Sequence, residues 1–352
     1  SSCQCSVRAS WAWSLFHMGQ TWFVVLLHFL LQSCTWQGFA SAQSPGFLVI
    51  SAPRNSKISW VRLPEDGNSD KLQPMTLIDE GLHHPQGIAV DQKRKRLFVA
   101  DPDVQKIYSY QLSIDGDTLS TYGPQMVVSR TAESRWVAVD GVGNLFFSDE
   151  PQNLILRVPA DKVLRGDPTP EVVYNGNTLT EVNQPGGVAV DNLHVYWTNK
   201  HFGMQAGSVI RASEFPESGI GGPAKSISVL ARNTVKSYGV CLALGNVYYT
   251  NSEKSVFGVK KTGGPVAEVT STLTHPRGCA WDGDGTVYVA DRAGAVYSFA
   301  GNMHNIGGAE VSRAFEVEDA FGLGVLQGTA RGCRDSVLSF ALTLVSILVL
   351  LQ

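Results

Sequence analysis

The sequence contains little charge. Asp, Glu, Lys and Arg make up 17% of its 352 residues, and the formal net charge is −3 at pH 7. The longest run of basic residues has four members, at positions 93–96. Because nucleic-acid-binding proteins present a broad basic surface, this composition argues against a nucleic-acid partner. We predict that residues 93–96 form a solvated hairpin turn between two strands.

Motifs of several enzyme classes are also missing. The Gly-x-Ser-x-Gly sequence of serine hydrolases does not occur. Residues 282–285 (DGDG) resemble the start of a calcium-binding loop, but Ala293 stands where such a loop has a bidentate glutamate. We therefore predict a β-turn at this position, and we predict no catalytic residue, metal ligand or cofactor.

An apolar run near the N-terminus, residues 22–31, is only half as long as a membrane-spanning helix. Its length, with the small residues at 40–42, is typical of a signal peptide and its cleavage site. If translation starts at Met18, residues 18–42 are the signal peptide and residues 1–17 are upstream read-through. An uncleaved signal anchor is the alternative.

A second apolar run, residues 337–352, is preceded by a polar spacer at 328–336. Small residues, a polar spacer and an apolar tail form the pattern of a glycosylphosphatidylinositol (GPI) attachment signal. The spacer is short, so attachment near Gly324 is a variant of this prediction. A tail retained as an intact membrane helix is the alternative. Both predictions indicate a protein of the secretory pathway that is secreted or held at the cell surface. We expect it to be a monomer.

Between these ends, residues 43–327 repeat a common unit. One copy reads GIAVD at 87–91, RLFVAD at 96–101 and KIYSY at 106–110, and a fourth apolar segment follows. Successive copies begin between 39 and 52 residues apart. Four short β-rich runs per copy, bounded by Gly, Asp, Asn and Pro, predict four antiparallel strands. Copies of this length predict an all-β fold of radially arranged blades, a β-propeller.

The sixth copy is split between the two ends of the region. Residues 321–326 match only the first strand of the unit, whereas residues 47–51 and 57–61 match the second and third. One blade assembled from both ends would close the ring and remove its unpaired strand edges. We therefore predict six blades.

The repeat resembles two known families. The sequence PQGIAVD at 85–91 with LFVAD at 97–101 resembles the NHL repeat, and VYWTN at 195–199 resembles the YWTD repeat of low-density-lipoprotein-receptor propellers. Both belong to the TolB-like superfamily, and the resemblance implies a six-bladed propeller over about residues 44–327. No copy carries an unaltered YWTD sequence, and the fold hosts many functions.

Only three cysteines follow residue 42: Cys241, Cys279 and Cys333. Cys241 and Cys279 lie one register position apart in successive copies, so their side chains should point to opposite faces of their sheets. We therefore predict two buried thiols and no disulfide between them.

Acidic and amide residues recur at two positions of the unit. Because they recur, we predict that they cap strand-end turns by accepting backbone hydrogen bonds and that they take no part in catalysis. They are Asp91, Asp140, Asp191 and Asp282 after the first strand, and Asp101, Asp149, Asn199, Asn251 and Asp291 after the second.

Candidate ligand-binding residues lie just before the first strand of each copy, where the chain should surround the mouth of the central channel. The inner set is Gln86, Arg135, Gly186, Tyr238, Arg277 and Phe321. The outer set is His84, Glu133, Gln184, Lys236, His275 and Asp319. Two arginines with aromatic neighbours predict binding of an anionic or aromatic group, whereas a plain solvated rim is the alternative. His84 and His275 share a position but lack a third ligand for zinc.

These observations favour a non-enzymatic recognition propeller that binds a protein, peptide or glycan at its channel mouth. A calcium- or zinc-dependent hydrolase or lactonase of the same fold is the alternative.

Overall fold

The computed structural model describes residues 46–64, 72–130, 132–201, 207–219, 221–232, 235–301 and 306–327. The described residues belong to one compact unit, Ser44–Thr329. The predicted signal peptide, spacer and apolar tail lie outside them. No helix in the described part of the chain is both long and apolar enough to cross a bilayer.

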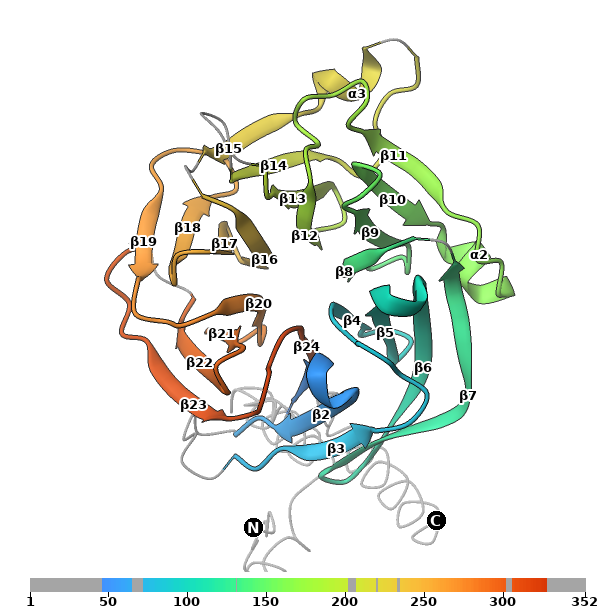
Figure 1. The fold of residues 1–352 in the computed structure, drawn as a ribbon, viewed down its shortest axis with the longest axis vertical. Helices are drawn as coiled ribbons and strands as arrows, with labels where there is room; N and C mark the ends of the chain where they lie inside the picture. Colours follow the sequence, from blue (N-terminus) through green and yellow to red (C-terminus); the bar gives the residue numbers. More distant parts are fainter. Residues whose placement is uncertain are drawn as a thin grey trace, which may run out of the picture. The chain divides into compact units, whose positions relative to one another are not determined.

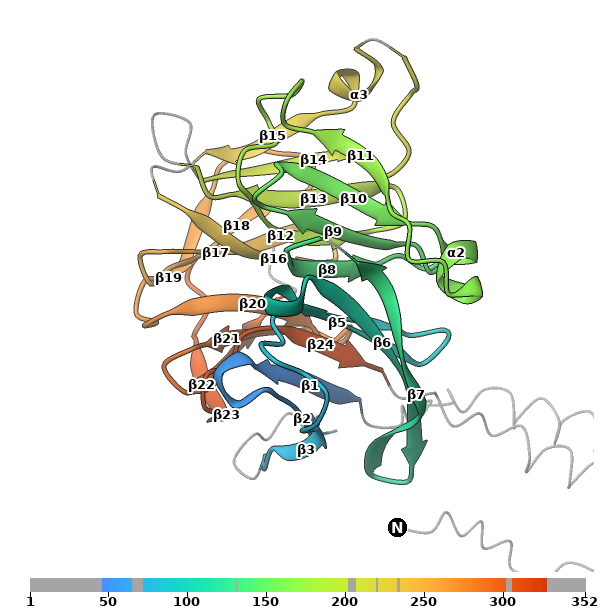
Figure 2. The ribbon, with the colours of Figure 1, turned by 45° about the vertical axis from the view of Figure 1, so that its right-hand side comes forward.

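Six four-stranded antiparallel sheets form the blades of a ring (Figure 1), seen turned by 45° in Figure 2. We number the blades by their innermost strands. Blade 1 contains β4 (Ile88–Asp91), β5 (Arg96–Asp101), β6 (Lys106–Asp115) and β7 (Thr118–Arg130). Blade 2 contains β8 (Ser134–Val139), β9 (Leu145–Asp149), β10 (Leu154–Val158) and β11 (Glu171–Asn175). Blade 3 contains β12 (Pro185–Val190), β13 (His194–Asn199), β14 (Ser208–Ser213) and β15 (Ser228–Arg232).

The remaining blades follow the same order. Blade 4 contains β16 (Ser237–Ala243), β17 (Asn246–Asn251), β18 (Val256–Lys260) and β19 (Ala267–Thr270). Blade 5 contains β20 (Pro276–Trp281), β21 (Thr286–Asp291), β22 (Ala295–Ala300) and β23 (Ser312–Glu316). Blade 6 contains β24 (Leu323–Leu326), β1 (Phe47–Ala52), β2 (Lys57–Arg62) and β3 (Met75–Ile78). Short helices occupy connections: η2 (Pro53–Asn55), η3 (Pro102–Val104), α2 (Ala160–Arg165) and α3 (Gly222–Lys225).

Blade 6 closes the ring as the split sixth copy predicts. Strand β24 pairs antiparallel with β1, with Phe47 opposite Leu326 and Ile50 opposite Leu323. The six-bladed fold is thereby confirmed. The basic residues at 93–96 also lie where predicted, at the hairpin between β4 and β5.

The hydrophobic core lies between the blades. Six clusters of buried side chains each join two neighbouring sheets, so both faces of every blade are covered. For this reason the second strands read as continuous apolar runs without polar alternation, and all six residues of β1 are buried. In the cluster between blades 2 and 3, the rings of Tyr174 and Trp197 lie 5.1 Å apart.

The prediction for the cysteines is wrong. Cys241 on β16 and Cys279 on β20 form a disulfide, with Cα atoms 5.6 Å apart. Their side chains do lie at different register positions, since Cys241 is opposite Tyr248 and Cys279 is opposite Val289. In a propeller, however, the opposite faces of successive blades meet. Side chains on opposite faces of successive sheets therefore point toward each other.

Candidate functional site at the mouth of the propeller

The strands of each blade run alternately, so the connecting loops gather on two faces. We call mouth face the one formed by the blade-to-blade loops and the loops between second and third strands. We call basal face the one formed by the loops between first and second and between third and fourth strands. The innermost strands surround the axis that joins the two faces (Figure 1).

Backbone hydrogen bonds place the predicted inner set in one ring around the axis. The N–H of Gly87 in blade 1 donates to the carbonyl of Arg135 in blade 2, at 3.0 Å. Likewise, the N–H of Gly278 in blade 5 donates to the carbonyl of Phe321 in blade 6, at 2.8 Å. At these two junctions the backbone of one blade thus holds the inner residue of the next.

Side-chain hydroxyls strengthen this ring from the second strands. Ser148 Oγ donates to the carbonyl of Gly186, and Thr250 Oγ1 donates to the carbonyl of Arg277, both at 2.7 Å. The equivalent hydroxyls of Ser51 and Thr198 donate to Gln86 and Tyr238. The backbone of the inner ring is therefore fixed by its neighbours.

Glycine follows the inner residue in five blades because the next blade lies so close. A Cβ atom at Gly239 would be 2.1 Å from the carbonyl oxygen of Arg277. Blade 2 is the exception, with Trp136 at this position. The Trp136 ring lies 5.0 Å from that of Phe321, although blade 1 separates their blades. These two rings therefore meet across the axis at the level of the inner ring.

Arg277 has an unusual environment for a cation at the mouth. Its guanidinium carbon lies 4.2 Å from the centre of the Tyr238 ring, and Nη1 donates to the carbonyl of Pro276 at 2.8 Å. Among the described residues, no carboxylate lies within 4 Å of this guanidinium. Burial lowers the pKa of Arg277 from its ordinary value, yet an arginine stays charged. Arg277 is thus a partly dehydrated cation without a close anion.

The buried Asp319 and the half-buried Arg292 form an ion pair next to it. Arg292 Nε lies 2.7 Å from Asp319 Oδ1, and the backbone N–H of Arg54 donates to Oδ2 at 2.8 Å. Asp319 is 1% exposed. This member of the predicted outer set therefore joins blades 5 and 6, and its carboxylate already has partners.

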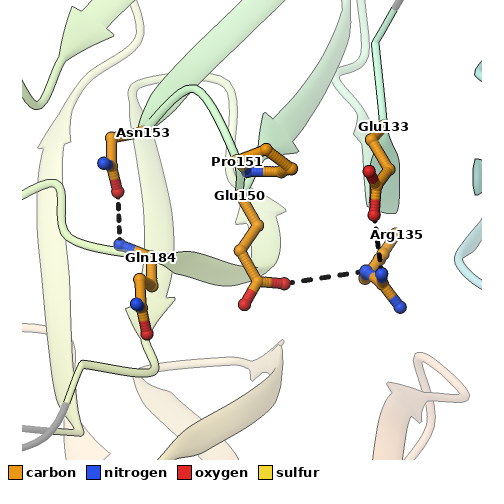
Figure 3. A pocket seen from close by; sticks show the side chains of 6 residues that line it. All are labelled: Glu133, Arg135, Glu150, Pro151, Asn153 and Gln184. Atoms are coloured by element: carbon orange, nitrogen blue, oxygen red, sulfur yellow. Dashed lines mark hydrogen bonds and ion pairs between the residues drawn. The ribbon is translucent and has the colours of Figure 1, made fainter.

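A cavity of about 370 Å³ opens across the mouth in blades 2 and 3 (Figure 3). Its lining consists of Glu133, Arg135, Glu150, Pro151, Asn153 and Gln184. Arg135 Nη2 lies 2.7 Å from Glu133 Oε1, and Arg135 Nε lies 3.6 Å from Glu150 Oε2. Glu150 is also paired with the buried ammonium group of Lys200, whose pKa is lowered by burial. The charges of this cavity are therefore matched internally.

The two histidines of the outer set are not brought together. They belong to blades 1 and 5, and their backbone N–H groups cap turns: His84 donates to Asp101 Oδ1 at 3.0 Å and His275 to Asp291 Oδ1 at 2.9 Å. In the described part of the chain, no three His, Cys, Asp or Glu residues could hold a metal ion. Lys236, the remaining outer cation, is half-buried.

The recurrent acids have the structural role predicted for them. Asp140 Oδ1 accepts hydrogen bonds from the N–H groups of Val142, Gly143 and Asn144, at 2.6–2.9 Å. The carboxylate of Asp282 caps the 282–285 turn in the same way. The predicted turn at this position is confirmed.

Three charged mouth residues were not predicted: Glu150, Lys200 and Arg292. Each directly follows the acid or amide that ends the second strand, at a position occupied by Pro102 in blade 1. The change of residue type and charge between copies at this position is the signal that could have found them.

No family model matches the chain, and no curated protein matches it in sequence. Solved structures do match the chain in fold. A chain from the crystal structure of a nidogen/laminin complex is 13% identical and has a TM-score of 0.62; the match covers 81% of this chain and 99% of that one. A gluconolactonase from Xanthomonas campestris is 14% identical and has a TM-score of 0.54, with 79% and 94% covered. These similarities show the six-bladed propeller fold that this chain shares.

Proposed function

We propose that this chain is a non-enzymatic recognition propeller, related in fold to NHL and YWTD propellers, that binds an acidic segment of a protein or peptide at its mouth face. The observation that carries this proposal is Arg277. Three charged neighbours at the mouth, Arg135, Lys200 and Arg292, have carboxylate partners, whereas the partly dehydrated Arg277 has none among the described residues. A carboxylate from a partner would complete its coordination.

The surroundings of Arg277 suit a carboxylate. Tyr238 covers one face of the guanidinium, and only one donor is used by Pro276, so N–H groups at its edge remain for an incoming anion. A charge-assisted hydrogen bond in a partly dehydrated site is worth about 1.5–3 kcal/mol. The stacked ring also limits the rotamers that must be frozen on binding.

The neighbouring side chains of the inner ring offer a ligand little surface. Phe321 and Trp136 are 5% and 7% exposed and pack against each other, and Gln86 is 4% exposed. The preference for a protein or peptide over a small anion therefore rests on the structural comparison. The protein complex named for the nidogen/laminin structure supports a protein partner for this fold.

The hydrolase alternative has less support. A calcium or zinc site needs converging carboxylates or histidines. At this mouth, Glu133, Glu150 and Asp319 are each within ion-pair distance of Arg or Lys. They would have to give up these partners to bind a metal. The similarity to a gluconolactonase concerns the fold alone.

We also propose that the chain is exported and attached to a membrane. The sequence of residues 18–42 supports export, and that of residues 328–352 supports attachment by GPI or by an apolar tail.

The test compares Arg277→Gln with Arg313→Gln, since Arg313 lies half-exposed on β23 and pairs with Glu316. The probes are acetylated hexapeptides with one Asp or Glu in an Ala, Val and Phe background, and the same peptides with Asn or Gln. Affinities are measured by fluorescence polarisation. The parent protein should bind the acidic peptides more tightly than the Asn or Gln peptides, and Arg277→Gln should bind the acidic peptides 10- to 100-fold more weakly than the parent does. Arg313→Gln should bind as the parent does.

Equal affinity of Arg277→Gln and the parent for acidic peptides would overturn the proposal. Calorimetric titration with CaCl₂ and ZnCl₂ tests the alternative, because saturable binding that Glu150→Gln abolishes would favour a metal-dependent enzyme. Binding of acidic oligosaccharides in place of peptides would indicate a glycan ligand.

A further inference from the structure

Large exposed apolar side chains are unevenly distributed between the two faces. Six of them lie on basal loops: Val142, Leu164, Leu193, Phe215, Leu244 and Val266. Among the described residues, no loop of the mouth face carries an exposed large apolar side chain. An excess of exposed apolar side chains on one face of a folded protein favours an interaction site on that face.

Three of these residues occupy hairpin tips in successive blades. Val142 (61% exposed) joins β8 to β9, Leu193 (71%) joins β12 to β13, and Leu244 (58%) joins β16 to β17. Leu244 has φ of 51°, in the left-handed region where Gly or Asn is ordinarily found. Positive φ also occurs in the corresponding hairpins, at Lys95 and Asn192, so the turn requires it; blade 4 differs in placing an exposed leucine there.

Two of the tips are also held in place by hydrogen bonds. Arg94 Nη2 of blade 1 donates to the carbonyl of Val142 in blade 2 at 2.5 Å. Within blade 3, the backbone N–H of Glu214 donates to the carbonyl of Leu193 at 3.1 Å. The apolar tips of blades 2 and 3 are therefore fixed in position.

Charged residues on these loops pair with one another. Arg165 lies 2.9 Å from Asp161, and Lys225 lies 3.5 Å from Glu217. The basic hairpin with Lys93 and Lys95 also belongs to this face. A phosphatidylcholine surface carries no net charge, however, so contact with it through the apolar tips should depend little on salt.

The chain leaves the propeller on the same face. Gln327, the last described residue, is hydrogen-bonded to two basal turns. Its N–H donates to Gln92 Oε1 at 2.9 Å, and its Nε2 donates to the carbonyl of Asp282 at 3.2 Å. Nine residues, 328–336, separate Gln327 from Val337, where the apolar tail of the sequence begins. Fully extended, they reach at most about 35 Å. A membrane that holds the tail, or a GPI group attached to the spacer, is thus within reach of the basal face.

We propose that the basal face lies on the membrane surface, with Val142, Leu193 and Leu244 in the interfacial layer of the bilayer and the mouth turned away from it. Side chains of this kind bury apolar area at the boundary between headgroups and acyl chains. This inference rests on the proposed attachment through residues 328–352 and is independent of the ligand at Arg277. It would leave the mouth free to meet a partner in solution.

The experiment uses the full chain reconstituted in phosphatidylcholine vesicles. An environment-sensitive fluorescent amino acid replaces Leu193 in one protein and His275, an exposed mouth residue, in another. We expect a blue-shifted emission at position 193 that bilayers containing brominated lipid quench at least twofold more than emission at position 275. Quenching should persist from 50 to 500 mM NaCl.

Equal quenching at the two positions, or its loss at high salt, would overturn the proposal. A blue shift at position 193 that grows with protein concentration in detergent without lipid would also overturn it, since a second copy of the chain would then cover the face. The substitution Leu244→Asp in the Leu193 reporter should reduce quenching without changing the melting temperature. The hexapeptide assay reports separately on the mouth.

Discussion

The guanidinium carbon of Arg277 lies 4.2 Å from the centre of the Tyr238 ring, and a disulfide links the strands that carry these two residues. Tyr238 lies three residues before Cys241 on β16, and Arg277 lies two residues before Cys279 on β20. The Thr250 hydroxyl fixes the carbonyl of Arg277 from behind. Covalent, hydrogen-bond and aromatic contacts therefore converge on one pair of side chains at the mouth, which is the strongest structural reason to place recognition there.

Replacing the aromatic ring should weaken recognition without unfolding the protein. In Tyr238→Leu the cation–π contact with Arg277 is lost, which is worth about 0.5–2 kcal/mol. We expect acidic hexapeptides to bind about 3- to 30-fold more weakly. Tyr238→Phe keeps the ring and is the matched control. If Leu and Phe variants bind equally, the ring does not position Arg277 for binding.

Removing the disulfide should cost stability. It closes a loop with a sequence separation of 38 residues. In the chain-entropy account such a loop is worth about 3–4 kcal/mol, and the double variant Cys241→Ala/Cys279→Ala should lose that amount in chemical denaturation. Dithiothreitol should destabilise the parent and leave the double variant unchanged. A parent that does not respond to dithiothreitol, with both cysteines alkylated after unfolding, would show that the thiols are free.

The sequence allowed the fold to be predicted because each blade repeats the same local pattern. The incomplete copies at residues 47–61 and 321–326 matched different strands of the unit, and the pairing of β1 with β24 confirms that they form one blade. The recurrent acids could likewise be assigned to turns, since turn capping is a local interaction.

Contacts between blades could not be predicted in this way. The register of Cys241 and Cys279 was correctly inferred, but their bond depends on how two sheets face each other. In the same way, Arg135 and Arg277 occupy the same position of the repeat, and the sequence pattern does not distinguish them as ligand-binding candidates. Only the structure shows that Glu133 and Glu150 neutralise Arg135, whereas Arg277 keeps an aromatic neighbour.

A buried carboxyl in blade 3 should make stability depend on pH. Glu214 is 1% exposed; Oε1 accepts the N–H of Asn192 at 3.0 Å, and Oε2 has no hydrogen-bond partner. Burial, assisted by the charge of Asp140, raises the pKa of Glu214 to about 7. The charge of Asp191 also raises the pKa of Glu214, and the charge of Arg157 lowers it.

Because this pKa is higher in the folded than in the unfolded chain, the folded state binds the proton more tightly. The stabilisation is complete below about pH 4 and is lost as the pH rises through 7. Glu214→Gln removes the charge that must otherwise be buried. At about 1.4 kcal/mol per pKa unit, we expect the variant to be more stable than the parent by on the order of 3–4 kcal/mol at pH 8, with a much smaller difference at pH 5.

The measurement is the free energy of unfolding by urea between pH 4.5 and pH 8. Glu217→Gln is the control, since Glu217 lies in the same connection but is 76% exposed on its side chain. Its profile should follow that of the parent. If Glu214→Gln and Glu217→Gln show the same pH profile, the Glu214 carboxyl is ionised in the folded protein at neutral pH, and the loss of stability above pH 5 must come from other groups.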